Sequence, residues 1–75
     1  MPRERVGTVE GFGERLQELM WKHNLSDGDV GKRISRNRKT VLAYRHGDGM
    51  PDGVILVRLC DALRTTPNYL LLGRE

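Results

Sequence analysis

Apolar residues recur at helical spacing through most of the chain. Phe12, Leu16 and Leu19 fall three and four positions apart, and polar residues such as Arg15 and Gln17 fill the opposite face. This spacing predicts an amphipathic helix that begins near Phe12 and ends near residue 23 or 24. No stretch shows the strict alternation of a half-buried strand, so the pattern predicts an all-α chain.

A second, shorter helix is expected over residues 27–34. Val30 and Ile34 are four positions apart and form its apolar side. Ser26 stands directly before it, where a hydroxyl can accept a hydrogen bond from a free backbone N–H of the first turn. Two glycines make this helix intrinsically weak, so packing against the rest of the domain must hold it.

A polar turn over residues 35–37 leads into a third helix, expected over residues 38–46. Val41 and Tyr44 are its core contacts, and Asn37 is a good N-cap. Gly47 follows as a natural helix stop. The chain therefore places two short helices on either side of a three-residue turn.

Two more helices complete an expected five-helix domain. Asp52 can cap a fourth helix over residues 53–64, and Thr66 followed by Pro67 predicts the start of a short fifth helix. The expected core positions of the fourth helix are Leu56, Leu59, Cys60 and Leu63. The fifth helix carries Tyr69, Leu70 and Leu72.

Length and composition narrow the class of protein. Seventy-five residues are enough for one domain, expected over residues 11–75 behind a flexible N-terminal arm of residues 1–10. Cys60 is the only cysteine, so neither a disulfide nor a four-ligand zinc site is expected. His23 and His46 are far apart in the chain, and no acidic pair accompanies a nucleophile, so we expect no enzyme and no cofactor. Without a membrane span or a signal peptide, we expect a cytoplasmic protein in a bacterial or phage-infected cell.

Positive charge is concentrated in one part of the chain. The net charge is +3, and between Val30 and Gly47 there is no Asp or Glu. Such a block is expected of a surface that faces phosphates, although a solvated helix face is the alternative. The basic residues of this block are Lys32, Arg33, Arg36, Arg38, Lys39 and Arg45, followed by His46.

Two short helices with a polar turn, the second helix basic, form the pattern of a helix-turn-helix. If the apolar sides of both helices are buried, the other face of the third helix points outward. The DNA major groove, about 12 Å wide, accepts one helix whose N-terminal side chains face base edges. The residues expected to read bases are Asn37, Arg38, Lys39, Leu42 and Ala43.

Each of these side chains suits a different contact. Arg38 can donate two hydrogen bonds to guanine and Asn37 can pair with adenine at two points, each worth about 1–3 kcal/mol of discrimination. Leu42 and Ala43 could lie on a thymine methyl group, although Leu42 could also be an ordinary exposed leucine. The residues expected at phosphates are Ser26, Lys32, Arg33, Arg36, Thr40, Arg45 and His46.

A family resemblance covers Phe12 to Gly73. The matching residues are Gly13-Glu14-Arg15-Leu16, Leu25-Ser26, Arg38, Thr40, Val41, Gly47, Pro51, Ala62-Leu63 and Asn68-Tyr69-Leu70-Leu71. In this register the chain resembles the phage repressor and Cro type of helix-turn-helix domain, the lambda-repressor-like or XRE family. The resemblance implies a five-helix transcriptional regulator that binds operator DNA as a dimer. We expect it to be a repressor of phage or plasmid type.

Several positions depart from the pattern of that family. Asp27 stands where members usually carry a glutamine that contacts a phosphate, and its carboxylate would repel DNA unless it turned to cap its own helix. Gly31 replaces a small alanine, and Ser35 replaces a turn glycine and would be strained at positive φ. Met20 and Arg45 replace the arginine and glutamate that pair in many members, so Arg45 is expected to be free for a phosphate.

A protein-interaction module of the same fold is the alternative from another functional class. It would bind a repressor, a toxin or a polymerase instead of DNA. Val54 and Ile55, with Leu71 and Leu72, are expected either in the core or on a surface for a homodimer or another partner. A dimer would let two recognition helices reach half-sites about 34 Å apart.

Overall fold

The computed structural model describes residues 10–74, which form five α-helices. They are α1 (Phe12–Lys22), α2 (Asp27–Ile34), α3 (Arg38–Arg45), α4 (Gly53–Leu63) and α5 (Pro67–Leu72). The expected all-α, five-helix architecture is confirmed, and the predicted helix boundaries agree with the structure to within two residues. Residues 1–9 of the predicted N-terminal arm lie outside the described residues.

Side-chain caps begin four of the five helices. Ser26, Asn37, Asp52 and Thr66 each accept a hydrogen bond from the backbone N–H three residues later, at 2.9–3.2 Å. The first N–H groups of a helix have no acceptor within the helix, so a polar side chain at this position stabilises the start. All four predicted caps are therefore confirmed.

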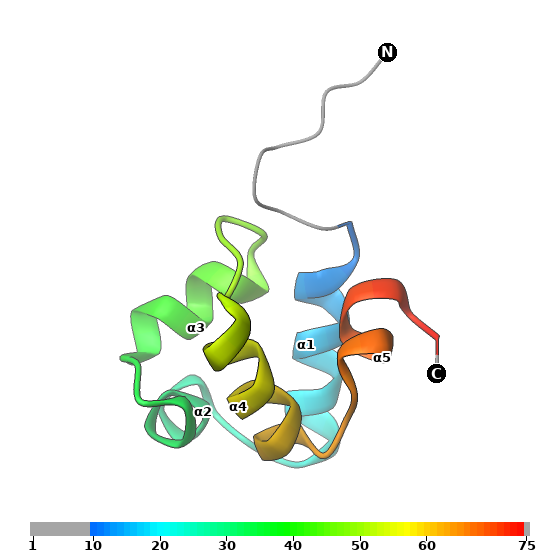
Figure 1. The fold of residues 1–75 in the computed structure, drawn as a ribbon. Helices are drawn as coiled ribbons and strands as arrows, with labels where there is room; N and C mark the ends of the chain where they lie inside the picture. Colours follow the sequence, from blue (N-terminus) through cyan, green and yellow to red (C-terminus); the bar gives the residue numbers. More distant parts are fainter. Residues whose placement is uncertain (1–9, 75) are drawn as a thin grey trace.

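The helices pack in an order that differs from their order in the chain. Figure 1 shows α4 in the centre, with α2 and α3 on one side and α1 and α5 on the other. Direct packing joins α2 to α3 and α4, α1 to α3 and α5, and α4 to α5. The core between them contains Phe12, Leu16, Leu19, Met20, Val30, Ile34, Val41, Tyr44, Ile55, Leu59, Cys60, Leu63 and Leu70.

The buried face of α4 differs from the predicted one. Ile55 is 2% exposed and belongs to the core, whereas Leu56 is only partly buried. Both residues are apolar, so helical periodicity alone does not decide which of them begins the buried face. Cys60 is buried as predicted, and its burial raises the pKa of the thiol.

Arg15 connects α1 to the end of the chain, although its spacing predicts a place on the solvent face. Its Nε donates to the carbonyl oxygen of Leu70 at 2.9 Å, and its Nη2 donates to that of Leu71 at 3.0 Å. The last carbonyl groups of a helix have no N–H donor within the helix. Arg15 satisfies two such groups of α5 and so fixes α5 against α1.

No helix within residues 10–74 is long and apolar enough to span a membrane.

Candidate nucleic-acid interface

Helices α2 and α3 pack together through the predicted apolar faces. The four buried side chains are Val30, Ile34, Val41 and Tyr44. Gly31 allows the turn to approach α2 closely, because a Cβ atom there would lie 2.8 Å from the carbonyl oxygen of Arg36. The helix-turn-helix therefore depends on a position without a side chain, as well as on its apolar residues.

Ser35 has the left-handed conformation that the family resemblance made a concern. Its φ is 63° and its ψ is 40°, a region that costs an L-residue roughly 1–2 kcal/mol. The backbone N–H of Arg36 then donates to the carbonyl oxygen of Gly31 at 2.9 Å, which closes the end of α2. This reversal sends the chain into α3, and Ser35 has the positive φ at which strain is expected.

The outer face of α3 presents two cations near its start. Arg38 and Lys39 are exposed, Leu42 is 40% exposed and Ala43 is partly buried. Within residues 10–74, no ion pair involves Arg38 or Lys39. Their charges therefore remain available to an external partner, while Val41 and Tyr44 hold the helix from behind.

Asn37 and Thr40 are joined by two hydrogen bonds, which bear on the predicted contacts of both residues with DNA. The Oδ1 atom of Asn37 accepts from the backbone N–H of Thr40 at 2.9 Å and from its hydroxyl at 3.0 Å. A carbonyl oxygen has two lone pairs, so both are used here, and two-point pairing of Asn37 with adenine would require the Thr40 hydroxyl to turn away. The hydroxyl of Thr40 donates to Asn37 in this structure, and its contact with a phosphate stays a prediction.

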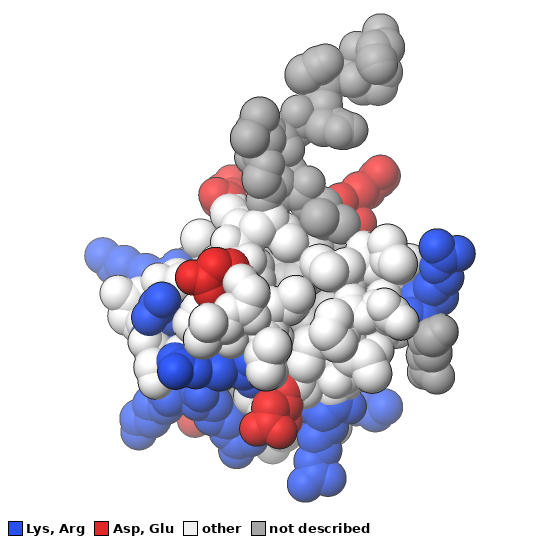
Figure 2. Space-filling view, in the orientation of Figure 1, with Lys and Arg blue, Asp and Glu red and all other residues white. Residues whose placement is uncertain are grey.

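Other basic side chains extend the positive surface around α3. Figure 2 shows Lys and Arg side chains along the left and lower-left edges of the molecule, over α3 and α2. Lys32 and Arg33 on α2, and Arg36 in the turn, are exposed. His46, the residue directly after α3, is exposed as well. These four residues stay candidates for phosphate contact.

Arg45 is not free, contrary to the sequence-based expectation. Its Nη1 donates to both carboxylate oxygens of Asp27 at 2.8 and 2.9 Å, and its Nη2 donates to Oε1 of Gln17 at 2.9 Å. The ion pair is only 22% and 21% exposed. Arg45 therefore ties the end of α3 to the first residue of α2 and to α1, in place of a phosphate contact.

Asp27 is engaged by Arg45 and does not cap α2. The cap is a reciprocal pair, in which Ser26 Oγ accepts from the N–H of Asp29 and Asp29 Oδ2 accepts from the N–H of Ser26. The backbone N–H and then the side chain of Ser26 lower the pKa of Asp29. Both carboxylates near the N-terminus of α2 are thus engaged within the protein, and a phosphate contact by Ser26 remains a prediction.

Sequence reasoning missed two residues that position this interface. Helical spacing predicts Gln17 on the solvent face, yet its Oε1 accepts a hydrogen bond from Arg45. At Gly13, a Cβ atom would overlap the carbonyl oxygen of Arg45, so the glycine lets α1 meet the end of α3. The motif Gly13-Glu14-Arg15-Leu16 of the resemblance was the available signal for Gly13, whereas nothing in the sequence distinguished Gln17.

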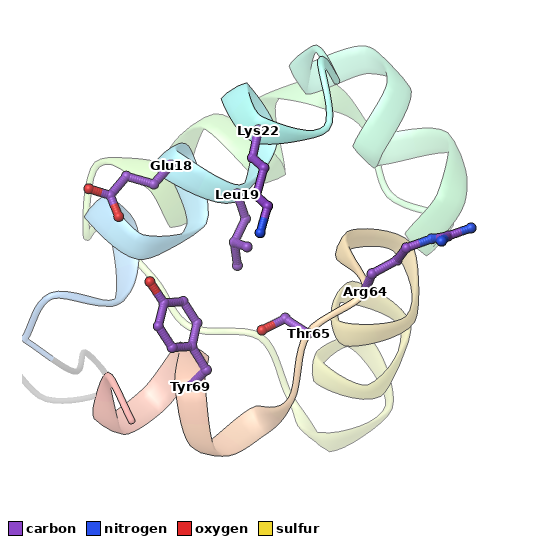
Figure 3. A pocket seen from close by; sticks show the side chains of 6 residues that line it. All are labelled: Glu18, Leu19, Lys22, Arg64, Thr65 and Tyr69. Carbon is purple, nitrogen blue, oxygen red and sulfur yellow. The ribbon is translucent and has the colours of Figure 1, made fainter. Parts of the chain in front are cut away.

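A hollow between α1 and α5 has both acidic and basic residues in its lining, unlike the positive surface around α3. It is lined by Glu18, Leu19, Lys22, Arg64, Thr65 and Tyr69. Figure 3 shows Lys22 and Tyr69 directed toward it from α1 and α5, while Arg64 extends away. Among residues 10–74, no three His, Cys, Asp or Glu side chains are grouped to hold a metal ion.

Comparison with known proteins places this geometry among solved structures of DNA-binding regulators. No family model and no curated protein matches the chain. The P22 c2 repressor, solved in complex with a synthetic operator, matches with a TM-score of 0.82 and 27% identity, over 84% of this chain and 96% of the repressor chain. The restriction-modification controller protein C.AhdI from Aeromonas hydrophila matches with a TM-score of 0.73 and 29% identity, over 79% and 89%. A transcriptional regulator from Listeria innocua matches with a TM-score of 0.76 and 26% identity, over 85% and 59%.

Proposed function

We propose that this chain, a lambda-repressor-like helix-turn-helix domain, is a sequence-specific regulator of transcription that binds double-stranded DNA. The observation that carries the proposal is the exposed start of α3, where Arg38 and Lys39 form no ion pair within residues 10–74. The P22 c2 repressor, which has a similar fold, was solved with a synthetic operator. We propose a repressor of phage or plasmid type, acting in the cytoplasm and without catalytic activity.

The base contacts follow from the geometry of α3. Arg38 donates two hydrogen bonds to a guanine in the major groove, and Lys39 donates to a neighbouring acceptor. Leu42, one turn later, covers a thymine methyl group, with Ala43 at the edge of the same contact. Asn37 contributes only its amide N–H groups, because its oxygen caps α3.

The phosphate contacts come from the elements around α3. Lys32, Arg33 and Arg36 are exposed cations on α2 and the turn, and His46 follows α3. The N-terminus of α2 adds free backbone N–H groups and the positive end of a helix dipole, which together favour an anion. Arg45 acts indirectly, because its bond to Asp27 removes a negative charge from the approach of DNA.

A homodimer would place two such helices on successive turns of DNA. Val54 and Val57, three residues apart on α4, are 62% and 65% exposed, and Leu72 on α5 is 58% exposed. Figure 2 shows a largely uncharged face over α4 and α5, bordered by acidic and basic side chains toward the lower end of α4. We propose this face as the dimer surface. Of the residues expected either on this surface or in the core, Ile55 belongs to the core and Leu71 is partly buried against the core.

The test begins with selection of bound duplexes from a random DNA pool. Binding of the selected duplex is then measured by fluorescence anisotropy across a salt series, and log K should fall by roughly 0.9 per log salt for each phosphate neutralised. The double variant Arg38→Ala plus Lys39→Ala should lose this binding. Lys22→Ala plus Arg74→Ala removes the same charge from two other exposed sites and should retain most of it.

Two results would contradict the proposal. One is a pool that yields no bound duplex even at low salt, and the other is full binding by the Arg38 and Lys39 double variant. Either result would favour the alternative function, a protein-interaction module of the same fold.

A further inference from the structure

Trp21, the only tryptophan of the chain, stands exposed on the last turn of α1. Its side chain is 69% exposed. Gln17 lies four residues earlier and therefore shares its face of the helix. Because Gln17 bonds to Arg45 at the end of α3, this face of α1 is the one that adjoins the helix-turn-helix.

Two surface hollows connect Trp21 to the start of α2. Both hollows are lined by Trp21, Leu25 and Ser26. One continues to Asp27 and Arg45, and the other continues to Asp29. The indole therefore lies beside the N-terminus of α2, which is the part of α2 suited to a phosphate.

The two carboxylates in this region do not prevent an approach by DNA. Asp27 is paired with the guanidinium of Arg45. Asp29 stays ionised and accepts the backbone N–H of Ser26, and the nearby cations Arg33 and Lys32 offset its charge. An anionic strand that follows the N-terminus of α2 would therefore meet engaged carboxylates, free helix N–H groups and an exposed indole.

We propose that Trp21 contacts the sugar–phosphate backbone of the DNA strand that passes the N-terminus of α2. The apolar face of the indole covers a deoxyribose, and its Nε1–H donates a hydrogen bond to a phosphate oxygen. This contact carries no sequence information and instead fixes how deeply α3 enters the groove. The inference rests on the proposed DNA-binding function and extends its interface from α2 and α3 to α1.

The experiment uses Trp21 as its own fluorescent probe. The selected duplex, cut to a single half-site, is labelled with a dye, so that anisotropy reports DNA binding independently of Trp21. Acrylamide quenching of Trp21 emission is then measured in the free protein and in the saturated complex. A half-site is used so that contacts between two protein copies do not cover the indole.

Binding of the half-site should reduce acrylamide quenching of Trp21 severalfold. Trp21→Ala should weaken half-site binding about tenfold, the loss expected for one hydrogen bond to a charged group, and Trp21→Phe should lose less because it keeps an apolar ring. The salt dependence should not change, because the indole is neutral. Val57→Ala trims a side chain of similar exposure on α4 and should bind the half-site as the wild type does.

Each contrary result has a separate meaning. If anisotropy shows half-site binding while Trp21 stays fully open to acrylamide and Trp21→Ala binds normally, the inference is overturned and the proposed function stands. Such an open indole would point to a protein partner at this surface. If no duplex binds at all, the proposed function fails and the inference falls with it. Thermal unfolding of Trp21→Ala, expected to match that of the wild type because the side chain is exposed, separates loss of contact from loss of fold.

Discussion

Arg45 and Asp27 join the last residue of α3 to the first residue of α2 through two hydrogen bonds of 2.8 and 2.9 Å. Gln17 accepts a third bond from the same guanidinium, whose buried Nε has no hydrogen-bond partner among residues 10–74. The pair holds the ends of both helices of the helix-turn-helix in register. It also explains how a carboxylate can stand where the lambda-repressor-like family usually carries a neutral glutamine.

Removal of Asp27 should therefore destabilise the domain. In Asp27→Ala, the partly buried Arg45 keeps only Gln17 as a partner, and we expect a loss of about 2 kcal/mol in the free energy of unfolding. Urea denaturation of Asp27→Ala, Arg45→Ala and the double variant measures the coupling between the two residues. Strictly additive effects of the two single variants would show that the ion pair contributes nothing to stability.

Ser35→Gly should stabilise the domain, because glycine adopts the left-handed conformation without a Cβ penalty. We expect a gain of about 0.5–1 kcal/mol, measured by urea denaturation. Asn24 has a similar φ of 59°, but asparagine tolerates this region, so Asn24→Gly is a matched control with a smaller gain. Equal stability of Ser35→Gly and the wild type would mean that the serine is not strained.

Two glycines of α2 should respond in opposite ways to alanine. At Gly28 the nearest atom to a new Cβ is Ser26 Oγ at 3.8 Å, so Gly28→Ala should stabilise by up to about 1 kcal/mol through helix propensity. At Gly31 the Cβ would lie 2.8 Å from the backbone oxygen of Arg36, so Gly31→Ala should destabilise despite its better propensity. Thermal unfolding of the two variants measures both effects. A gain in stability at both positions would contradict the close contact at the turn.

Arg38 and Lys32 should differ in what their removal changes. Arg38→Ala should cost about 1–3 kcal/mol of DNA binding and relax the preference for one base pair. Lys32→Ala should weaken all duplexes alike and reduce the salt slope by about one. Repeated selection from a random pool, with a salt titration for each variant, distinguishes the two effects. An unchanged base preference in Arg38→Ala would show that Arg38 does not read a base.

Val57→Asp should prevent dimerisation if the largely uncharged face over α4 and α5 is the dimer surface. A charge buried at an apolar interface without a partner is strongly unfavourable. Sedimentation should show a monomer at concentrations where the wild type is a dimer, and cooperative binding to a two-site operator should disappear. Affinity for a single half-site should be preserved, and its loss would indicate a damaged fold.

The sequence by itself determined the local features of this protein. Helix boundaries follow from apolar periodicity and from side chains that satisfy the first N–H groups, as at Ser26 and Asn37. The positive φ of Ser35 was indicated by one position of the family pattern. The exposed placement of Arg38 and Lys39 followed from burial of the opposite face. Each of these depends on residues within a few positions of one another, because capping and helix-face relations are local.

Only the tertiary structure decided the contacts between distant parts of the chain. Arg45 finds Asp27 18 residues away, and Arg15 reaches the carbonyl group of Leu70 55 residues away. The choice of Ile55 over Leu56 for the core depends on how α4 is rotated against its neighbours. These outcomes could not be predicted because the rotation and spacing of packed helices arise from the fit of all their side chains together, whereas periodicity describes each helix alone.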